Sequence, residues 1–179
     1  MSKKLFVISG PSGAGIGDIL AAVFARREDV SPVTPVTARK MKEGERDGVG
    51  FFFFDLEGWN ALKESGDLLE ATEFAGNDYG TSRRLVAEKL EAGKNVLLDL
   101  ELSRAAQLKA NMPEAVCVYI EPSRPVLEQR YRALCRSDLE LSLRLETAER
   151  LREQSAFCDV RLNSDELDKA VDALCALLG

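Results

Sequence analysis

Residues 4–18 read KLFVISGPSGAGIGD, in which an apolar run passes directly into a glycine-rich turn. The run from Lys4 to Ser9 has the length and the branched side chains of a buried strand. A helical pattern follows from Asp18 to Arg27, with its apolar side chains on one side. Glycines let the backbone curl so that its N–H groups point inward, and the helix N-terminus adds partial positive charge there. The stretch therefore predicts a turn that can bind an anion.

The spacing within this turn is that of a P-loop, the GxxxxGK[ST] motif that holds nucleotide phosphates. Gly10 and Gly15 have the required separation, but Ile16 stands in place of the lysine and Asp18 adds a negative charge. The lost charge weakens phosphate binding, because a charge pair at 4 Å is worth about 4 kcal/mol at an effective dielectric constant of 20. Taken alone, the turn is also compatible with a tight strand-to-helix connection that binds no ligand. The Asp18 carboxylate could also be a ligand of Mg²⁺. The candidate phosphate-binding residues of this degenerate loop are Ser12, Gly13, Ala14, Gly15, Ile16, Gly17 and Asp18.

The rest of the chain alternates between strand-length apolar runs and helical patterns, which is typical of an open parallel α/β sheet. The runs 95–100 (NVLLDL) and 115–120 (AVCVYI) are nearly continuous in apolar residues, as central strands covered on both faces are. Ser82 and Ser164 are expected to be the N-caps of two helices. Further strands are expected at 48–55 and 68–74, and helices at 56–63, 82–90, after Ser123, over 130–150 and at the C-terminus.

The aromatic stretch between residues 48 and 80 interrupts this alternation. We interpret it as an insertion over the carboxyl edge of the sheet, where ligands bind in this class of fold. The length of 179 residues predicts one domain. We divide it into a core (about 1–34, 82–129 and 158–179), a strand-rich lobe (about 35–81) and an arginine-rich helical segment (about 130–157), whose charges are also compatible with a solvated helical face.

Composition and charge exclude several classes of function. The net charge of −6 argues against nucleic acid and anionic membranes as partners. The sequence has no histidine, which excludes His-based catalysis and His metal sites, and its four cysteines form no CxxC pair. We therefore expect no resident metal site and buried, reduced cysteines. No signal peptide or membrane span is visible, so we expect a cytoplasmic protein.

Read in order, the motifs of the chain resemble those of guanylate kinases over about residues 4–178. They are GPSGAG, TARKMKEGERDGVGFFFF, LLEATEFAGNDYGTS, NVLLDLELSRA, VYIEPS and VRLNSDELDKAV, of which the EGxxDG and GNxYGTS stretches are the most specific. The resemblance implies a P-loop NTPase-type α/β fold, a parallel sheet flanked by helices with a small strand-rich GMP-binding lobe and a helical lid. It also implies ATP-dependent phosphorylation of GMP to GDP, with Mg²⁺ accompanying ATP.

The resemblance assigns candidate residues on both sides of this reaction. Arg39 and Lys42 match the basic residues that hold the acceptor phosphate, and Glu70 matches the carboxylate that reads the N1–H and the exocyclic amine of guanine. Arg130 and Arg144 match lid arginines that close over the phosphates. The GMP-binding set is Arg39, Lys42, Glu45, Phe51, Glu70, Tyr79, Thr81 and Glu101, and the catalytic set is Arg39, Arg130, Arg144 and Asp99.

Several positions depart from the family pattern. Pro35 and Phe51 replace an expected serine and tyrosine, and Arg104 replaces a glycine. Glu101 replaces an aspartate. The lid segment is about two residues shorter than usual in the family, so the sequence does not decide whether Arg136 belongs to the lid arginines. The retained residues predict a mostly preserved GMP site, whereas the changes in the P-loop predict a damaged ATP site.

Three functions remain open on the sequence. The first is the family reaction, weakened or lost because the P-loop lysine is Ile16. The second is a catalytically inactive pseudokinase that binds GMP or a phosphorylated peptide, which would give it a protein partner. The third is a kinase for another phosphorylated acceptor such as a ribose bisphosphate, against which Glu70 and the YGTS motif argue.

Overall fold

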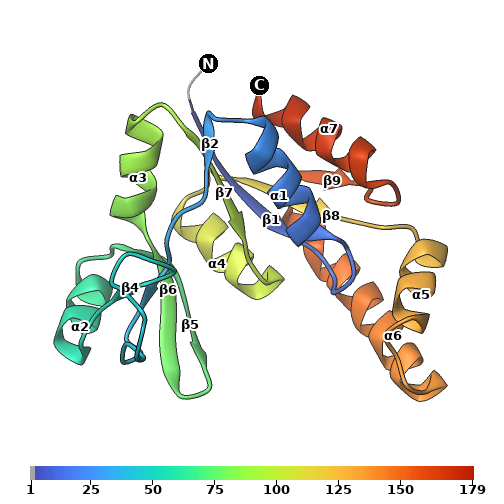
Figure 1. Cartoon of the computed structure of the whole chain (residues 1–179), viewed down its shortest axis with the longest axis horizontal. Coiled ribbons are helices and arrows are strands. Elements are labelled where there is room, and N and C mark those ends of the chain that lie inside the picture. Colours follow the sequence, from blue (N-terminus) through green and yellow to red (C-terminus); the bar gives the residue numbers. More distant parts are fainter. Residues whose placement is uncertain (1–2) are drawn as a thin grey trace.

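A five-stranded parallel sheet forms the centre of the molecule (Figure 1). The computed structural model describes residues 3–179. The strands lie in the order β2-β7-β1-β8-β9, and every pairing between them is parallel. This confirms the predicted parallel α/β class and places the apolar runs 95–100 and 115–120 on either side of β1. The bounds are Leu5–Ser9 (β1), Val30–Ser31 (β2), Asn95–Asp99 (β7), Val116–Ile120 (β8) and Val160–Leu162 (β9).

Helices cover both faces of this sheet. Side chains alternate along β1, so Phe6 and Ile8 join one hydrophobic cluster while Leu5 and Val7 join the other. The first cluster is closed by α1 (Ile16–Arg26) and α7 (Leu167–Leu178), and the second by α3 (Arg83–Glu91) and α4 (Leu102–Asn111). Burial on both faces explains why the central strands are nearly continuous in apolar residues.

A smaller four-stranded sheet forms the lobe that extends beside α4 in Figure 1. Its strand order is β4-β3-β6-β5, with β3 and β4 parallel and the other pairs antiparallel. The strands are Val36–Thr37 (β3), Phe52–Phe53 (β4), Leu68–Phe74 (β5) and Asn77–Ser82 (β6), and α2 spans Leu56–Glu64. The predicted strand at 68–74 is confirmed.

The predicted strand over 48–55 is wrong in extent, because only Phe52–Phe53 pair as a strand. Gly48 and Gly50 have φ angles of 78° and 80°, in the left-handed region that residues with side chains rarely adopt. The backbone therefore turns through residues 48–50 before it enters the lobe sheet.

Two helices and one helical turn lie on the opposite side of Figure 1 from the lobe, over the segment predicted as the lid (about 130–157) and the residues 124–129 before it. They are α5 (Arg124–Arg132), α6 (Asp138–Gln154) and η1 (Ser155–Phe157). The predicted helix over 130–150 is wrong in extent, because turns at residues 133–137 separate α5 from α6. Leu127 and Tyr131 of α5 pack against Leu141 and Ala148 of α6 in a small hydrophobic cluster of their own. The helix predicted after Ser123 is confirmed as α5, with Pro125 in its first turn.

One predicted helix cap is confirmed and the other is wrong. Ser82 caps α3 by accepting a hydrogen bond from the backbone N–H of Leu85. Ser164 does not cap α7, whose N-cap is Glu166; its buried hydroxyl instead donates to the carbonyl of Ala14, at 2.8 Å. This hydrogen bond of Ser164 thus links the glycine-rich turn to the segment before α7.

The cysteines differ from the expectation of burial. All four are free, but only Cys117 is buried, and the others are half-buried. The thiol groups of Cys117 and Cys158 lie 2.7 Å apart.

Candidate functional site

The turn between β1 and α1 has the backbone shape that the sequence predicts. Gly13 and Gly15 adopt left-handed φ angles of 78° and 81°, and the N–H of Ala14 donates to the carbonyl of Pro11. Gly15 is the N-cap of α1, and among residues 3–179 no side chain accepts a hydrogen bond from the first turn of the helix. The N–H groups of that turn therefore remain available to an anion.

Ile16 occupies the place of the P-loop lysine without supplying a charge. Its side chain packs at the edge of the core cluster under α1, and its Cδ1 would lie 3.3 Å from a Cβ added at Gly10. Asp18 is exposed in the first turn of α1. The start of α1 therefore carries one carboxylate and no basic side chain.

The lid helix α5 is hydrogen-bonded to the outer side of the loop. The guanidinium of Arg130 donates to the carbonyls of Gly13 and Ser164, at 2.8 and 2.7 Å, and the hydroxyl of Tyr131 donates to the carbonyl of Ser12. Arg130 and Asp18 line the same cavity of about 280 Å³ along the loop. Arg130 is thus next to the loop, with its side chain bound to backbone oxygens.

Arg144 of α6 approaches the loop from another direction. It pairs with Glu140 on its own helix and lies over the ring of Tyr131, 5.9 Å from the ring centre. The pair with Glu140 raises the pKa of the Arg144 guanidinium. Arg144 lines a cavity of about 370 Å³ that also includes Ser12. Arg136 is exposed, and its backbone N–H donates to Glu140.

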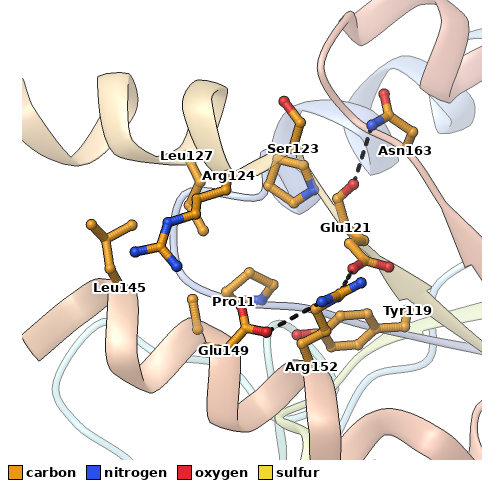
Figure 2. Close-up of a pocket in the computed structure, with 12 residues that line it drawn as sticks. Pro11, Tyr119, Glu121, Ser123, Arg124, Leu127, Leu145, Glu149, Arg152 and Asn163 are labelled. Atoms are coloured by element: carbon orange, nitrogen blue, oxygen red, sulfur yellow. Dashed lines mark hydrogen bonds and ion pairs between the residues drawn. The ribbon is translucent and has the colours of Figure 1, made fainter. Parts of the chain in front are cut away.

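A separate cavity of about 370 Å³ lies between α5, α6 and the end of β8 (Figure 2). Figure 2 shows Arg152 between the carboxylates of Glu121 and Glu149, with which it forms ion pairs. Tyr119 lies at the same cavity, and its buried hydroxyl has no hydrogen-bond partner within residues 3–179. The charge of Arg152 is therefore matched by carboxylates of the protein.

Arg39 and Glu45, which the sequence predicts on the acceptor side, are paired with each other. The guanidinium of Arg39 holds both carboxylate oxygens of Glu45, at 2.7 and 3.0 Å, and it lies over the rings of Phe51 and Phe53. Hydrogen bonds from Arg39 and from the backbone N–H of Lys42 lower the pKa of Glu45 from 4.5 to about 2. The fork of Arg39 is therefore fixed in orientation.

Two further residues of the predicted GMP set adjoin this pair. The ring of Tyr79, on β6, lies 5.7 Å from the ring of Phe51, between ring centres. The side chain of Lys42 is exposed. The structure thus brings Arg39, Glu45, Phe51 and Tyr79 together on the lobe, with Lys42 at its edge.

Glu70 on β5 lies in a buried cluster of three residues. Its carboxylate accepts two hydrogen bonds from the guanidinium of Arg104 on α4, at 2.6 and 2.8 Å, and a third from the hydroxyl of Thr81, at 2.7 Å. The side chain of Glu70 is fully buried, while that of Arg104 is 20% exposed. The sequence shows that Arg104 departs from the family pattern. It does not predict the pair with Glu70, because the two residues are far apart in the chain.

Asp99 and Glu101 lie at the carboxyl end of β7, on the side of the P-loop. Desolvation raises the pKa of Asp99, although the residue as a whole is exposed. Glu101 is the N-cap of α4 and lines a cavity of about 560 Å³ with Gly10 and Ser12. Within residues 3–179, no group of three or more Cys, Asp or Glu side chains is arranged to hold a metal ion by itself.

The candidate residues therefore form two groups. Arg130, Arg144 and Glu101 surround the glycine-rich loop, whereas Arg39, Glu45, Tyr79 and the Glu70 cluster lie on the lobe. In the part of the chain that the structure describes, no side-chain hydrogen bond or ion pair joins the lobe to the loop or to the lid.

Comparison with known proteins decides the family. The sequence model named guanylate kinase matches residues 2–179. The chain belongs to the guanylate kinase family.

Its relatives include the guanylate kinase of Thermobifida fusca, which is 39% identical over 98% of this chain and 91% of that protein. The guanylate kinase of Parasynechococcus marenigrum is 39% identical over 98% of this chain and 97% of the relative. The chain thus spans nearly the whole length of these guanylate kinases.

Solved structures agree with this fold. The crystal structure of guanylate kinase from Anaplasma phagocytophilum covers 99% of this chain and 85% of its own, with a TM-score of 0.65 and 21% identity. Shikimate kinase from Bacteroides thetaiotaomicron has a TM-score of 0.54 at 14% identity over 98% of both chains, which is a likeness of fold. Within the described residues of this guanylate kinase family member, no helix is both long and apolar enough to cross a membrane.

Proposed function

We propose that this chain binds GMP on its lobe and phosphorylates it with ATP at a much reduced rate. Membership of the guanylate kinase family supports the reaction, and Ile16 supports the reduction. Phosphoryl transfer depends chiefly on positioning and charge stabilisation, without a protein nucleophile. A chain that keeps the fold and several arginines can therefore retain activity while it lacks the P-loop lysine.

The GMP phosphate is proposed to bind at Arg39, Lys42 and Tyr79. Arg39 has the planar fork that suits phosphate oxygens, and Glu45 together with two phenylalanine rings holds the fork in place. Lys42 adds a single exposed charge beside it. Phosphate binding at Arg39 requires the guanidinium to share its donors between Glu45 and the ligand.

The ATP phosphates are proposed to bind at the N–H groups of residues 13–17, with Arg144 and Arg130 on the lid side. Mg²⁺ bound with ATP would neutralise phosphate charge and usually keeps several waters, so one or two carboxylates suffice to hold it. Asp99 fits this role, because its carboxylate is partly desolvated at the end of β7 and has no ion-pair partner within residues 3–179. Asp18 opposes the binding of phosphate by its negative charge.

The observation that carries the proposal is the contrast between the preserved Arg39 site and the uncharged Ile16 in the loop. The test is a coupled assay of GDP formation from ATP and GMP, at enzyme concentrations high enough to detect a slow rate. We expect a low rate that depends on GMP and disappears in Arg39→Ala. The matched control is Arg46→Ala, a change at an exposed arginine of the same segment, which should leave the rate unchanged.

A second candidate function is binding of GMP without turnover. It is favoured by the apolar side chain of Ile16, which packs against the edge of the core and supplies no charge for a phosphate. Calorimetric binding of GMP with no detectable GDP formation in the same preparation would select this function. Absence of both binding and turnover would contradict the first proposal and the second.

A further inference from the structure

We infer that Arg104 occupies the base-reading carboxylate of Glu70, and that it thereby lowers the preference of the acceptor pocket for guanine over hypoxanthine. The inference rests on the proposed function, because it concerns the same acceptor pocket. It names the acceptor class as 6-oxopurine nucleoside monophosphates, with or without the exocyclic amine.

The geometry that carries the inference is the two-pronged contact between Arg104 and Glu70. Nε of Arg104 donates to one carboxylate oxygen and its terminal nitrogen to the other, at 2.6 and 2.8 Å. Thr81 donates a further hydrogen bond to the second oxygen. The carboxylate is fully buried, so these contacts account for its environment within the protein.

The chemistry of this contact is the same as that of guanine recognition. The N1–H and the exocyclic amine of guanine are two parallel donors, and a carboxylate reads them by accepting from both. The guanidinium of Arg104 presents two parallel donors in the same way. Arg104 takes the paired contact to both carboxylate oxygens, and Thr81 already donates to one of them, so guanine must displace Arg104 to form the same paired contact.

The consequence for selectivity follows from what guanine and hypoxanthine share. Both carry the oxygen at C6 and the N1–H, and only guanine has the exocyclic amine. A pocket that reads the amine through Glu70 rejects hypoxanthine because the carboxylate loses a donor. With Arg104 on the carboxylate, the amine has no acceptor there, and the two bases become nearly equal.

A purely structural role for Arg104 is the competing explanation, since the pair also links α4 to β5. The link does not depend on Arg104 alone. Gln107 on α4 accepts a hydrogen bond from the N–H of Ala71, and Asn111 donates to the carbonyl of Leu69. These contacts hold the same helix on the same strand, and Gln107 provides a matched control on the next turn.

The experiment is calorimetric titration of GMP and IMP, without ATP, into the wild type, Arg104→Ala and Gln107→Ala. We expect the wild type to bind the two nucleotides within about threefold of each other, and Arg104→Ala to prefer GMP by about tenfold or more, because Glu70 regains its reading role. Gln107→Ala should keep the wild-type ratio. Adding Glu70→Gln to Arg104→Ala should abolish the new preference.

Because Arg104→Ala leaves a buried carboxylate without its partner, it can lower stability. Arg104→Met keeps much of the packing of this side chain but has no donor for Glu70, and it carries the same test if the alanine variant does not fold. A GMP-to-IMP ratio that is unchanged in the folded variant overturns the role of Arg104 while leaving the acceptor pocket intact. Binding of neither nucleotide by the wild type or the variant overturns both the role and the proposed function.

Discussion

Restoring the P-loop lysine should raise the rate of GMP phosphorylation. The change is Ile16→Lys, made alone and together with Asp18→Thr. In the structure, residue 16 is the first residue of α1, directly after the left-handed Gly15, so its side chain leaves the loop where the N–H groups converge. A lysine there brings a positive charge to the phosphates, and the second change removes a negative charge from the same helical turn.

The magnitude follows from Coulomb attraction set against lost packing. A charge pair at 4 Å contributes about 4 kcal/mol at an effective dielectric constant of 20, and each 1.4 kcal/mol is tenfold in rate, so the gain is about a thousandfold. Ile16 is only half-buried, so its replacement loses about 1 kcal/mol of apolar burial. The methylene groups of lysine recover part of this, and we expect the melting temperature to fall by no more than about 4 °C.

The assay is coupled detection of GDP formation at saturating ATP and GMP. Ile16→Met is the matched control, since it alters the packing of the same position without adding charge, and its rate should equal that of the wild type. A rate for Ile16→Lys with Asp18→Thr that stays at the wild-type level, in a folded protein that binds GMP, would refute the reasoning. The missing lysine would then not be what limits transfer.

Three further predictions concern contacts that do not involve the charge at position 16 or 18. Ser164→Ala should lower the free energy of unfolding by about 1–3 kcal/mol, because a P-loop carbonyl loses its buried donor; unchanged thermal denaturation would contradict this. The ion pair of Glu45 with Arg39 lowers the carboxyl pKa from 4.5 to about 2, so its stabilisation is present above pH 4.5 and disappears as the pH falls toward 2. An NMR titration of the Glu45 carboxyl with a midpoint above pH 4 would argue against the pair. Diamide, which is reduced to its hydrazine as it takes up the two thiol hydrogens, should link Cys117 to Cys158 within one chain, and non-reducing peptide mapping without that link would show that the thiols do not approach.

Local patterns in the sequence predict the central sheet and the loop well. The apolar runs become β1, β7 and β8, and the glycine spacing becomes the left-handed turn before α1. These features are determined by residues close together in the sequence, so hydrophobic periodicity and the positions of glycines are enough to predict them. The same reasoning fails over 48–55, where aromatic residues suggest a strand but two glycines turn the chain.

Contacts between distant parts of the chain account for what the sequence does not predict. Arg104 meets Glu70 across the packing of α4 on β5, and Arg130 meets the carbonyl of Gly13 across the packing of the lid on the loop. Ser164 has the residue type of a helix cap, yet in the tertiary structure its hydroxyl donates to the carbonyl of Ala14 on the loop. In each case the side-chain chemistry is visible in the sequence, whereas its partner is fixed by the fold.

The central claim is that the chain keeps a nucleoside monophosphate site at Arg39 while its P-loop has lost its cation. The most direct test is calorimetric titration of GMP into the wild type and into Arg39→Ala, without ATP. We predict saturable heat for the wild type, with a dissociation constant in the micromolar to millimolar range, and none for the variant. Absence of heat with the folded wild type, or equal binding by Arg39→Ala, would contradict the claim.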